Sequence, residues 1–403
     1  MVECQCGVFI AHRQGANRCF VGGWDYFSRL VSAPRWSHVT SGRERPIGKV
    51  MDVFDEPTLP SVLRGPSGDA IVSAHALGVP QQSIAMYARW WQLEAWVRDL
   101  VYMELRAAFG AEWTDAVKRA QRREERDASF SHMTGVDNDN PLAYLDYSQL
   151  VQIIRSDWNL FAPSLFEQTA WEGRQAELLQ IRHRIGHIRR PNRDDLGRIE
   201  QTLRDLEAGA FIAMSDYNSR WRPPTTGADA VTDGWIRGNH RTAQRLTEHA
   251  QRRYDIEYQV QFSARPWATA PFEYGAGILC HVDFHAGQRT IDVAQLWRDL
   301  GALGLLKYVV AIDVGNATWV GVTFSGADDA DVVSDAIGKT FEVVLQVSSP
   351  GYDPERWAKR EQSYRQIDYR VHVDTGWNIV AADTLPISNF NAGGGVEFPP
   401  SRT

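Results

Sequence analysis

The sequence predicts a multidomain protein in which an all-α helical bundle is followed by an α+β domain. Between residues 80 and 211, apolar residues recur at the three- and four-residue spacing of amphipathic helices. After about residue 250 the pattern changes to short runs of β-branched and aromatic residues, several of which alternate with polar ones. We therefore expect an irregular N-terminal arm, a helical bundle, a linker and an α+β domain, at residues 1–75, 80–211, 212–245 and 246–403.

The overall charge limits the kinds of ligand that the protein can bind. The formal net charge is −7 and the sequence pI is about 5.9. Proteins that coat nucleic acid without sequence preference are usually basic overall. Any contact with RNA or DNA must therefore depend on a local basic patch.

The N-terminal segment and the cysteines indicate a cytoplasmic protein with no membrane partner. The four cysteines, Cys4, Cys6, Cys19 and Cys280, are scattered and form no disulfide framework, which fits a reducing compartment. No apolar run approaches the roughly 18 residues of a membrane-spanning helix, and the opening stretch does not resemble a signal peptide. A zinc site formed by His12 with the first three cysteines is an alternative, but their spacing matches no common zinc pattern.

Four helical units account for the predicted bundle. The first, "QSIAMYARWWQLEAWVRDLVYMELRAAFG", has no interruption before its final glycine and predicts one long helix. The others are "NPLAYLDYSQLVQIIRSDWNLF", "SLFEQTAWEGRQAELLQIRHRIGHIRR" and "NRDDLGRIEQTLRDLEAGAFIAMSDY", with Asn192 as the expected N-cap of the last. Short loops between four helices favour a bundle. The predicted buried stripe of the first helix is Ile84, Tyr87, Trp91, Leu93, Val97, Val101 and Leu105.

Strand-like runs separated by helical segments predict the α+β domain. The runs are "YDIEYQVQF", "GILCHVDF", "KYVVAIDV", "TWVGVTFS", "FEVVLQV" and "IDYRVHV". The segments "TIDVAQLWRDLGALG" and "DDADVVSDAIG" between them are helical in pattern. No phosphate-binding glycine loop and no GxSxG motif is present, so we expect no cofactor.

The stretch "RHRIGH" near the end of the third helix carries the candidate chemistry. Leu178, Ile181, Ile185 and Ile188 form the predicted buried stripe of this helix. Arg182, His183, Arg189 and Arg190 lie off the stripe, and the helix should end before Pro191. Cations at a helix C-terminus are favoured by the helix dipole, which explains the two later arginines without any function. The helix dipole explains the two histidines, His183 and His187, less well.

An arginine and a histidine together fit RNA cleavage by the strand's own 2′-hydroxyl. Histidine titrates near neutral pH, so His187 is the candidate general base. Arginine offers a fixed fork for phosphate, so Arg182 is the candidate phosphate-binding group. The two residues are five positions apart, and their directions on an ideal helix differ by about 140°. They converge only if the helix loosens near Gly186 or if a second copy of the chain completes the site.

The region 80–211 resembles HEPN domains, an all-α family of RNA-cleaving and RNA-binding modules. The resemblance rests on "YARWWQLEAWVRDLVYMEL", "YLDYSQLVQIIRSDWNLF" and "LLQIRHRIGHIRRP". The family motif is an arginine, usually Asn, Asp or His, a few more residues and then a histidine. This chain has His183 in the polar position, and Gly186 where Ala commonly precedes the histidine. In the family, two protomers place both motifs in one cleft, and many members are toxins or defence nucleases.

The resemblance implies a metal-independent endoribonuclease that acts as a homodimer on RNA, as a toxin or an anti-phage effector. Arg182 and His187 are the implied catalytic residues, and His183, Arg189 and Arg190 would bind RNA. The α+β domain would sense a trigger, select the RNA or hold the nuclease silent. An antitoxin or a trigger protein is a possible partner.

Two other interpretations of the sequence remain open. In the first, the bundle is a non-catalytic RNA-binding or dimerisation module. In the second, the protein is a metal-dependent hydrolase, because His281, Asp283 and His285 alternate along a predicted strand and share one face. The acidic run "GADDADVVSD" lacks the pattern of a calcium loop and is expected to begin a helix. Glu94, Arg98 and Asp99 are expected to form a salt-bridged face or to line a dimer cleft.

Overall fold

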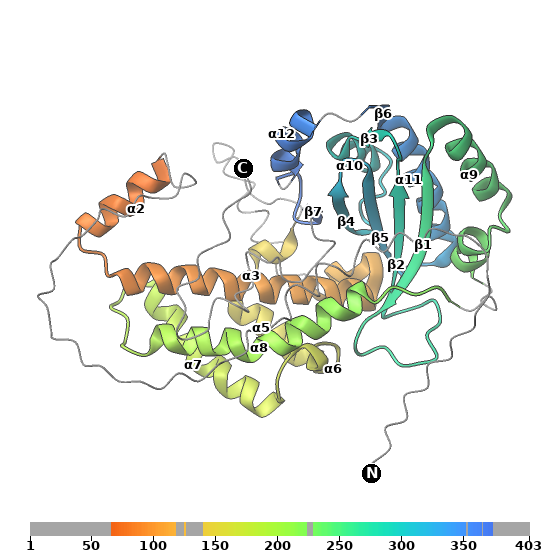
Figure 1. The fold of residues 1–403 in the computed structure, drawn as a ribbon. Helices are drawn as coiled ribbons and strands as arrows, with labels where there is room; N and C mark the ends of the chain where they lie inside the picture. The colour runs from red at the N-terminus through yellow and green to blue at the C-terminus, as the bar shows by residue number, and fades with distance from the viewer. Residues whose placement is uncertain are drawn as a thin grey trace, which may run out of the picture. The chain divides into compact units, whose positions relative to one another are not determined.

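Helices and strands are segregated along the chain in the computed structural model (Figure 1). The structure describes residues 66–117, 125, 140–223, 229–351, 354–364 and 366–373. These residues have a mixed α/β fold and belong to one compact unit. The predicted zinc ligands Cys4, Cys6, Cys19 and His12 lie outside them. Within the described part of the chain, no helix combines the length and the apolarity needed to cross a membrane.

The first part of the described chain is helical. The long first helix is confirmed as α3 (Gln81–Phe109). The other α-helices there are α2 (Pro66–Ala76), α5 (Tyr147–Ser156), α6 (Trp158–Phe161), α7 (Gln168–Gly186) and α8 (Asp195–Asn218). Short 3-10 helices are η2 (Gly110–Val117), η3 (Pro141–Tyr144) and η4 (Ala162–Ser164). All of helix α2 except its last residue lies in the arm that was expected to be irregular, so that expectation was wrong over residues 66–75.

The core of the helical region surrounds α3, which packs on α5, α7 and α8. The predicted buried stripe of α3 was wrong at two positions. Trp90 is 6% exposed and belongs to the core, whereas Tyr87 and Trp91 are 58% and 62% exposed. Adjacent residues on a helix point about 100° apart, and at this position the direction of Trp90 faces the core whereas that of Trp91 faces solvent.

The second part of the chain forms a five-stranded sheet in the order β1-β2-β5-β4-β7. Its strands are β1 (Glu257–Ala264), β2 (Ile278–His285), β4 (Val309–Asn316), β5 (Trp319–Ser325) and β7 (Val371–Val373). All neighbours pair antiparallel except β4 and β7, which are parallel. β3 (Arg289–Ile291) and β6 (Ser348–Pro350) form a separate two-stranded sheet. The helices are η5 (Thr232–Ile236), a π-helix, with α9 (Arg241–Tyr254), α10 (Val293–Ala302), α11 (Ala330–Val347) and α12 (Pro354–Tyr364).

Two predictions in this part were wrong. The run "FEVVLQV" was expected to be a strand, but it forms the end of α11. Its apolar residues continue the helical spacing set by the preceding turns, and Phe341 and Val344 are fully buried, so packing overrides the strand preference of valine. The expected linker, residues 212–245, contains the end of α8, the whole of η5 and the start of α9.

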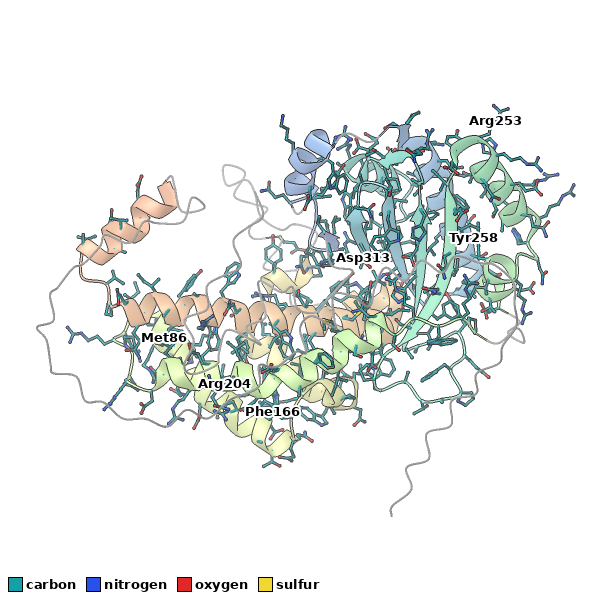
Figure 2. All side chains as sticks on the ribbon, viewed as in Figure 1. Met86, Phe166, Arg204, Arg253, Tyr258 and Asp313 are labelled. Atoms are coloured by element: carbon teal, nitrogen blue, oxygen red, sulfur yellow. The ribbon has the colours of Figure 1, made fainter. Side chains whose placement is uncertain are left out.

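The two faces of the five-stranded sheet differ in chemistry. One face is apolar and packs on helices; Tyr258 and Phe284 both contact Phe341 of α11. The opposite face carries buried polar side chains, among them His281 and Asp313. Figure 2 labels Tyr258 and Asp313, which belong to these two faces.

The helical region and the sheet are joined by buried polar contacts. Glu104, near the end of α3, forms a fully buried ion pair with Arg265, and it also accepts a 2.7 Å hydrogen bond from the Trp267 indole. The Tyr102 hydroxyl donates to the carbonyl oxygen of Val310 at 2.7 Å. Buried charges are tolerated only where they are paired, so these contacts fix how α3 meets the sheet.

Candidate active site at the end of helix α7

Helix α7 ends where the sequence predicts, before Pro191, and its last turn is held by backbone hydrogen bonds. His187 is the C-cap, and its N–H donates to the carbonyl of His183 at 3.1 Å. The N–H of Arg189 donates to the carbonyl of Arg184 at 2.9 Å, a pattern that closes helices with a left-handed residue.

The left-handed residue is Ile188, with φ of 54°. A β-branched side chain in this conformation is strained by roughly 1–2 kcal/mol. Its side chain is also 96% exposed, so the prediction that Ile188 belongs to the buried stripe was wrong. Leu178 and Ile181 of that stripe are buried as expected. The motif therefore lies directly before a strained and exposed apolar residue.

Arg182 lines a surface cavity of about 290 Å³ between α7 and α3. Among the described residues, Arg182 has no hydrogen-bond or ion-pair partner, although its side chain is partly buried. The other lining residues are Tyr87, Trp90, Trp91, Glu94, Arg98, Ile185 and Gly186. An unpaired guanidinium group beside a cavity is available for an anionic ligand.

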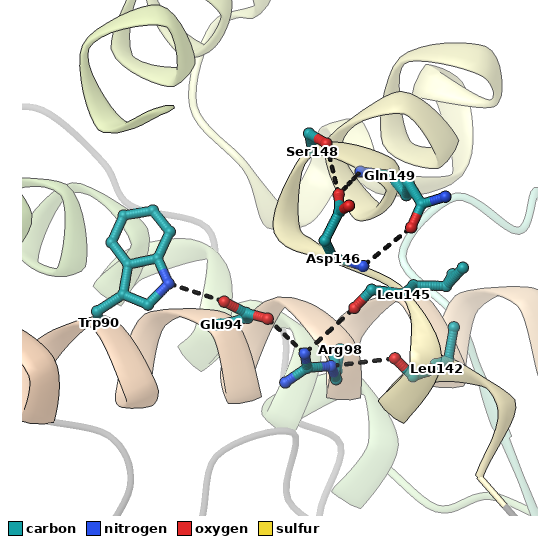
Figure 3. Close-up of polar contacts among 8 residues, drawn as sticks. All are labelled: Trp90, Glu94, Arg98, Leu142, Leu145, Asp146, Ser148 and Gln149. Carbon is teal, nitrogen blue, oxygen red and sulfur yellow. Dashed lines mark hydrogen bonds and ion pairs between the residues drawn. The ribbon is translucent and has the colours of Figure 1, made fainter. Parts of the chain in front are cut away.

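Glu94 and Arg98 of the same cavity are engaged with protein groups, as Figure 3 shows. Glu94 accepts a 2.7 Å hydrogen bond from the Trp90 indole and forms an ion pair with Arg98. Arg98 also donates to the carbonyl oxygens of Leu142 and Leu145 at 3.1 and 3.3 Å. The predicted salt-bridged face is confirmed for Glu94 and Arg98 but not for Asp99, which forms no ion pair in the described chain. This pairing leaves Arg182 as the cation of the cavity without a protein partner among the described residues.

The two histidines of the motif lie together outside this cavity. The rings of His183 and His187 stack with their centroids 6.1 Å apart and an interplanar angle of 13°. Both residues are exposed. One protomer therefore does not place either histidine among the residues that line the cavity of Arg182.

Arg189 and Arg190 line an adjoining cavity of about 230 Å³. Tyr87 and Ile185 belong to both cavities, so the two form neighbouring parts of one surface. Both arginines are exposed, and neither has a protein partner in the described chain. The structure thus brings Arg182, Arg189 and Arg190 around one aromatic surface.

Sequence reasoning missed Arg184, which holds the end of α7 against α8. Its guanidinium donates to both carboxylate oxygens of Asp195, at 2.7 and 2.5 Å. Burial raises the pKa of Asp195, but Arg184 and the backbone N–H of Asn192 outweigh it, so the pKa lies below its usual range. The expected N-cap was also wrong, because Asp194 occupies that position and Asn192 donates to Asp195.

The predicted metal ligands of strand β2 are used differently. His281 is buried, and its two ring nitrogens lie 2.7 Å from the Ser263 hydroxyl and 2.9 Å from the Thr323 hydroxyl. Burial, with the nearby Arg220 and Arg265, holds its pKa well below the usual range. His285 is exposed at the end of the strand. The described residues contain no group of three or more His, Cys, Asp or Glu that could hold a metal ion.

Asp283 takes part in an ion-pair cluster on the same sheet face. Arg220, just after α8, contacts Asp283 at 2.6 Å and Asp313 at 3.8 Å. The Tyr217 hydroxyl donates to Asp313 at 2.8 Å. Gly321 lies on β5 between the two carboxylates, and a Cβ there would come within 2.8 Å of Asp283. This cluster anchors the end of α8 to the sheet.

The acidic run before α11 begins a helix, as expected. Asp329 is the N-cap, and its side chain accepts from the N–H groups of Asp331 and Val332. Asp328 accepts a 2.7 Å hydrogen bond from the N–H of Ala111. These carboxylates are therefore engaged in capping and in holding η2.

No family model, curated protein or solved structure matches the chain. The resemblance to HEPN domains stays a prediction from the sequence.

Proposed function

We propose that this protein is a metal-independent endoribonuclease whose active site includes Arg182 and His187. The observation that carries the proposal is the contrast between two arginines of one helical turn. Arg184 forms an ion pair with Asp195, whereas Arg182 lines a cavity and has no partner in the described chain. A partly buried cation without a counter-charge is costly unless a ligand supplies one.

The reaction would be a transesterification within the RNA strand. His187 takes the proton of a 2′-hydroxyl, and the resulting oxyanion attacks the adjacent phosphorus. Arg182 donates to the non-bridging oxygens and stabilises the charge that develops on them. The bond to the 5′-oxygen breaks, this oxygen takes up a proton from water, and His187 releases its proton to the solvent. The products carry a 2′,3′-cyclic phosphate and a 5′-hydroxyl.

The separation of the two residues supports a homodimeric site. Arg182 lines the cavity beside α3, while His187 stacks on His183 outside it. In a two-fold dimer that brings the ends of both α7 helices together, Arg182 of one copy would face His187 of the other. The exposed Ile188 beside His187 would then be covered.

The test is cleavage of RNA by purified protein in EDTA. Wild type is compared with Arg182→Ala and His187→Ala, and with the matched controls Arg155→Ala and His249→Ala, which change exposed residues elsewhere. Cleavage by wild type and by both controls, but not by the two site variants, supports the proposal. Equal cleavage by all five proteins would contradict the assignment of the site.

A toxin or defence role follows from the resemblance alone. If it holds, expression of the wild-type protein arrests growth, and His187→Ala relieves the arrest at the same protein level. Arrest that persists in this variant would point to a different activity. A non-catalytic RNA-binding module would bind RNA without cutting it in the EDTA assay.

A further inference from the structure

Two aromatic side chains of α3 are exposed although the helix has a well-formed core. Tyr87 and Trp91 are separated by four residues and lie on one face of the helix. Their neighbours Trp90 and Trp96 are 6% and 2% exposed, so tryptophan elsewhere on the helix is buried. Large aromatic residues gathered at one exposed place mark an interaction surface.

This aromatic face lies between arginines that have no partner among the described residues. Trp91 and Tyr87 line the cavity of Arg182, and Tyr87 also lines the cavity of Arg189 and Arg190. The protein carries a net charge of −7, so a group of arginines without partners in the described part of the chain is opposite in sign to its overall charge. The ligand that fits this surface has flat apolar groups and negative charges at short intervals.

A single strand of RNA has this chemistry. Its unpaired bases stack on aromatic side chains, and its phosphates pair with arginine. A duplex keeps its bases stacked on one another and offers only phosphates and groove edges. A protein partner would cover the rings, but it would also have to supply a separate acidic side chain for each of the three guanidinium groups. Charge complementarity therefore favours the single strand.

We propose that Trp91 and Tyr87 form a base-stacking subsite that holds an unpaired nucleobase of single-stranded RNA beside Arg182. The inference rests on the proposed ribonuclease function and specifies its substrate class. The subsite would place the phosphate that follows the stacked base against the guanidinium group of Arg182. Gly186 lines the same cavity, and a Cβ built on it meets no atom within 4 Å, so the space beside it is open.

The experiment measures binding separately from cleavage. Fluorescence anisotropy with a labelled single-stranded oligoribonucleotide is recorded in the His187→Ala background, so that the RNA stays intact. Adding Trp91→Ala should weaken binding roughly 5- to 150-fold, the range expected for one stacked base. Trp91→Phe should retain most of the affinity. Phe211→Ala, which removes an exposed aromatic ring on α8 that lines neither cavity, should have no effect.

A matched set of oligonucleotides identifies the stacking partner. An abasic position scanned along the strand should weaken binding at one site, and Trp91→Ala should abolish that position's effect, because ring and base are lost from the same contact. Binding of a blunt duplex should not respond to Trp91→Ala. Equal affinity of the parent and the Trp91→Ala variant for the single strand would overturn the inference.

Sedimentation of the same variants tests whether a second copy of the chain, rather than RNA, covers the aromatic face. Trp91→Ala should leave the oligomeric state unchanged. Dissociation of the assembly by this substitution would overturn the inference and assign the aromatic face to an interface between copies. The two proposals fail separately: wild type that binds the strand through Trp91 without cutting it refutes only the nuclease, and cleavage that is insensitive to Trp91→Ala refutes only the subsite.

Discussion

The end of α7 and the polar face of the sheet carry similar side chains in opposite states. On the sheet, His281, Asp283 and Asp313 are buried, and each has a protein partner. At the end of α7, Arg182 and His187 are partly or fully exposed, and Arg182 has no partner in the described chain. Residue type alone therefore does not distinguish a structural cluster from a candidate site; the two regions differ in the pairing and the exposure of these side chains.

The largest expected effect separates activity from stability. Arg182→Ala and His187→Ala should each lower the RNA cleavage rate by roughly 10²- to 10⁴-fold, since in the proposed mechanism each removes a group that acts in the transition state. The free energy of unfolding should change by no more than about 0.5 kcal/mol, because neither side chain supports the core. Cleavage rates and urea unfolding of the same preparations check both parts. A loss of stability that accompanies the loss of activity would contradict the prediction that these two side chains serve cleavage and not the fold.

Mixing the two inactive variants tests whether one site is built from two chains. In a mixed dimer of Arg182→Ala and His187→Ala, one of the two composite sites keeps both residues. If half of the dimers are mixed, about a quarter of wild-type activity should return. The control is either variant mixed with itself. Subunit exchange is first verified independently. If exchange occurs and activity still does not recover, Arg182 and His187 act within one protomer.

In the ion-pair cluster of Arg220 on the sheet, a substitution should lower stability without lowering the cleavage rate. Arg220→Ala leaves Asp283 and Asp313 buried without their counter-charge, which should lower the free energy of unfolding by about 3–5 kcal/mol. Urea unfolding measures this, with Arg155→Ala as the exposed control. The cleavage rate of the remaining folded protein should stay near wild type. A large effect on cleavage without one on stability would assign this cluster to the active site instead.

The sequence predicted most helices and strands but not which polar groups are free. Periodicity located α3 and α7, yet it could not decide between Trp90 and Trp91, because two adjacent tryptophans fit two phases of one helix. It placed Ile188 in the core because a left-handed helix end has no signal when the residue is isoleucine.

Contacts between residues far apart in the chain could not be predicted from the sequence for a different reason. Asp283 and Asp313 meet Arg220 only because the register of β2, β5 and β4 places Gly321 between them. The pattern His-x-Asp-x-His was visible, but the hydroxyls that occupy the His281 nitrogens come from two other strands. The candidate site itself was found from a local motif, since Arg182 and His187 lie within one turn and a half of helix.

Asp99 offers an intermediate case, a carboxyl group that is partly buried on α3. Burial raises its pKa from 3.8 to about 7, although Arg98 opposes the shift. A raised pKa in the folded state means that stability is present at acid pH and is lost as the pH rises from about 4 to about 7. Asp99→Asn should remove this loss and stabilise the protein at pH 8, on the order of 1 kcal/mol once solvent screening is allowed for. Unfolding curves at pH 5 and pH 8 should show a larger gain at pH 8; equal gains would mean that Asp99 titrates normally.

The smallest expected effect concerns Gly186, where the motif departs from the usual alanine. Its Cβ would meet no atom within 4 Å and its φ is not positive, so alanine fits without strain. Gly186→Ala should raise the free energy of unfolding by up to about 1 kcal/mol, because alanine loses less backbone freedom in a helix. Thermal or urea unfolding measures the gain. Cleavage by this variant is measured as well: Gly186 lines the cavity of Arg182, so a fall in activity with rising stability would show that the open space at Gly186 serves the ligand rather than the fold.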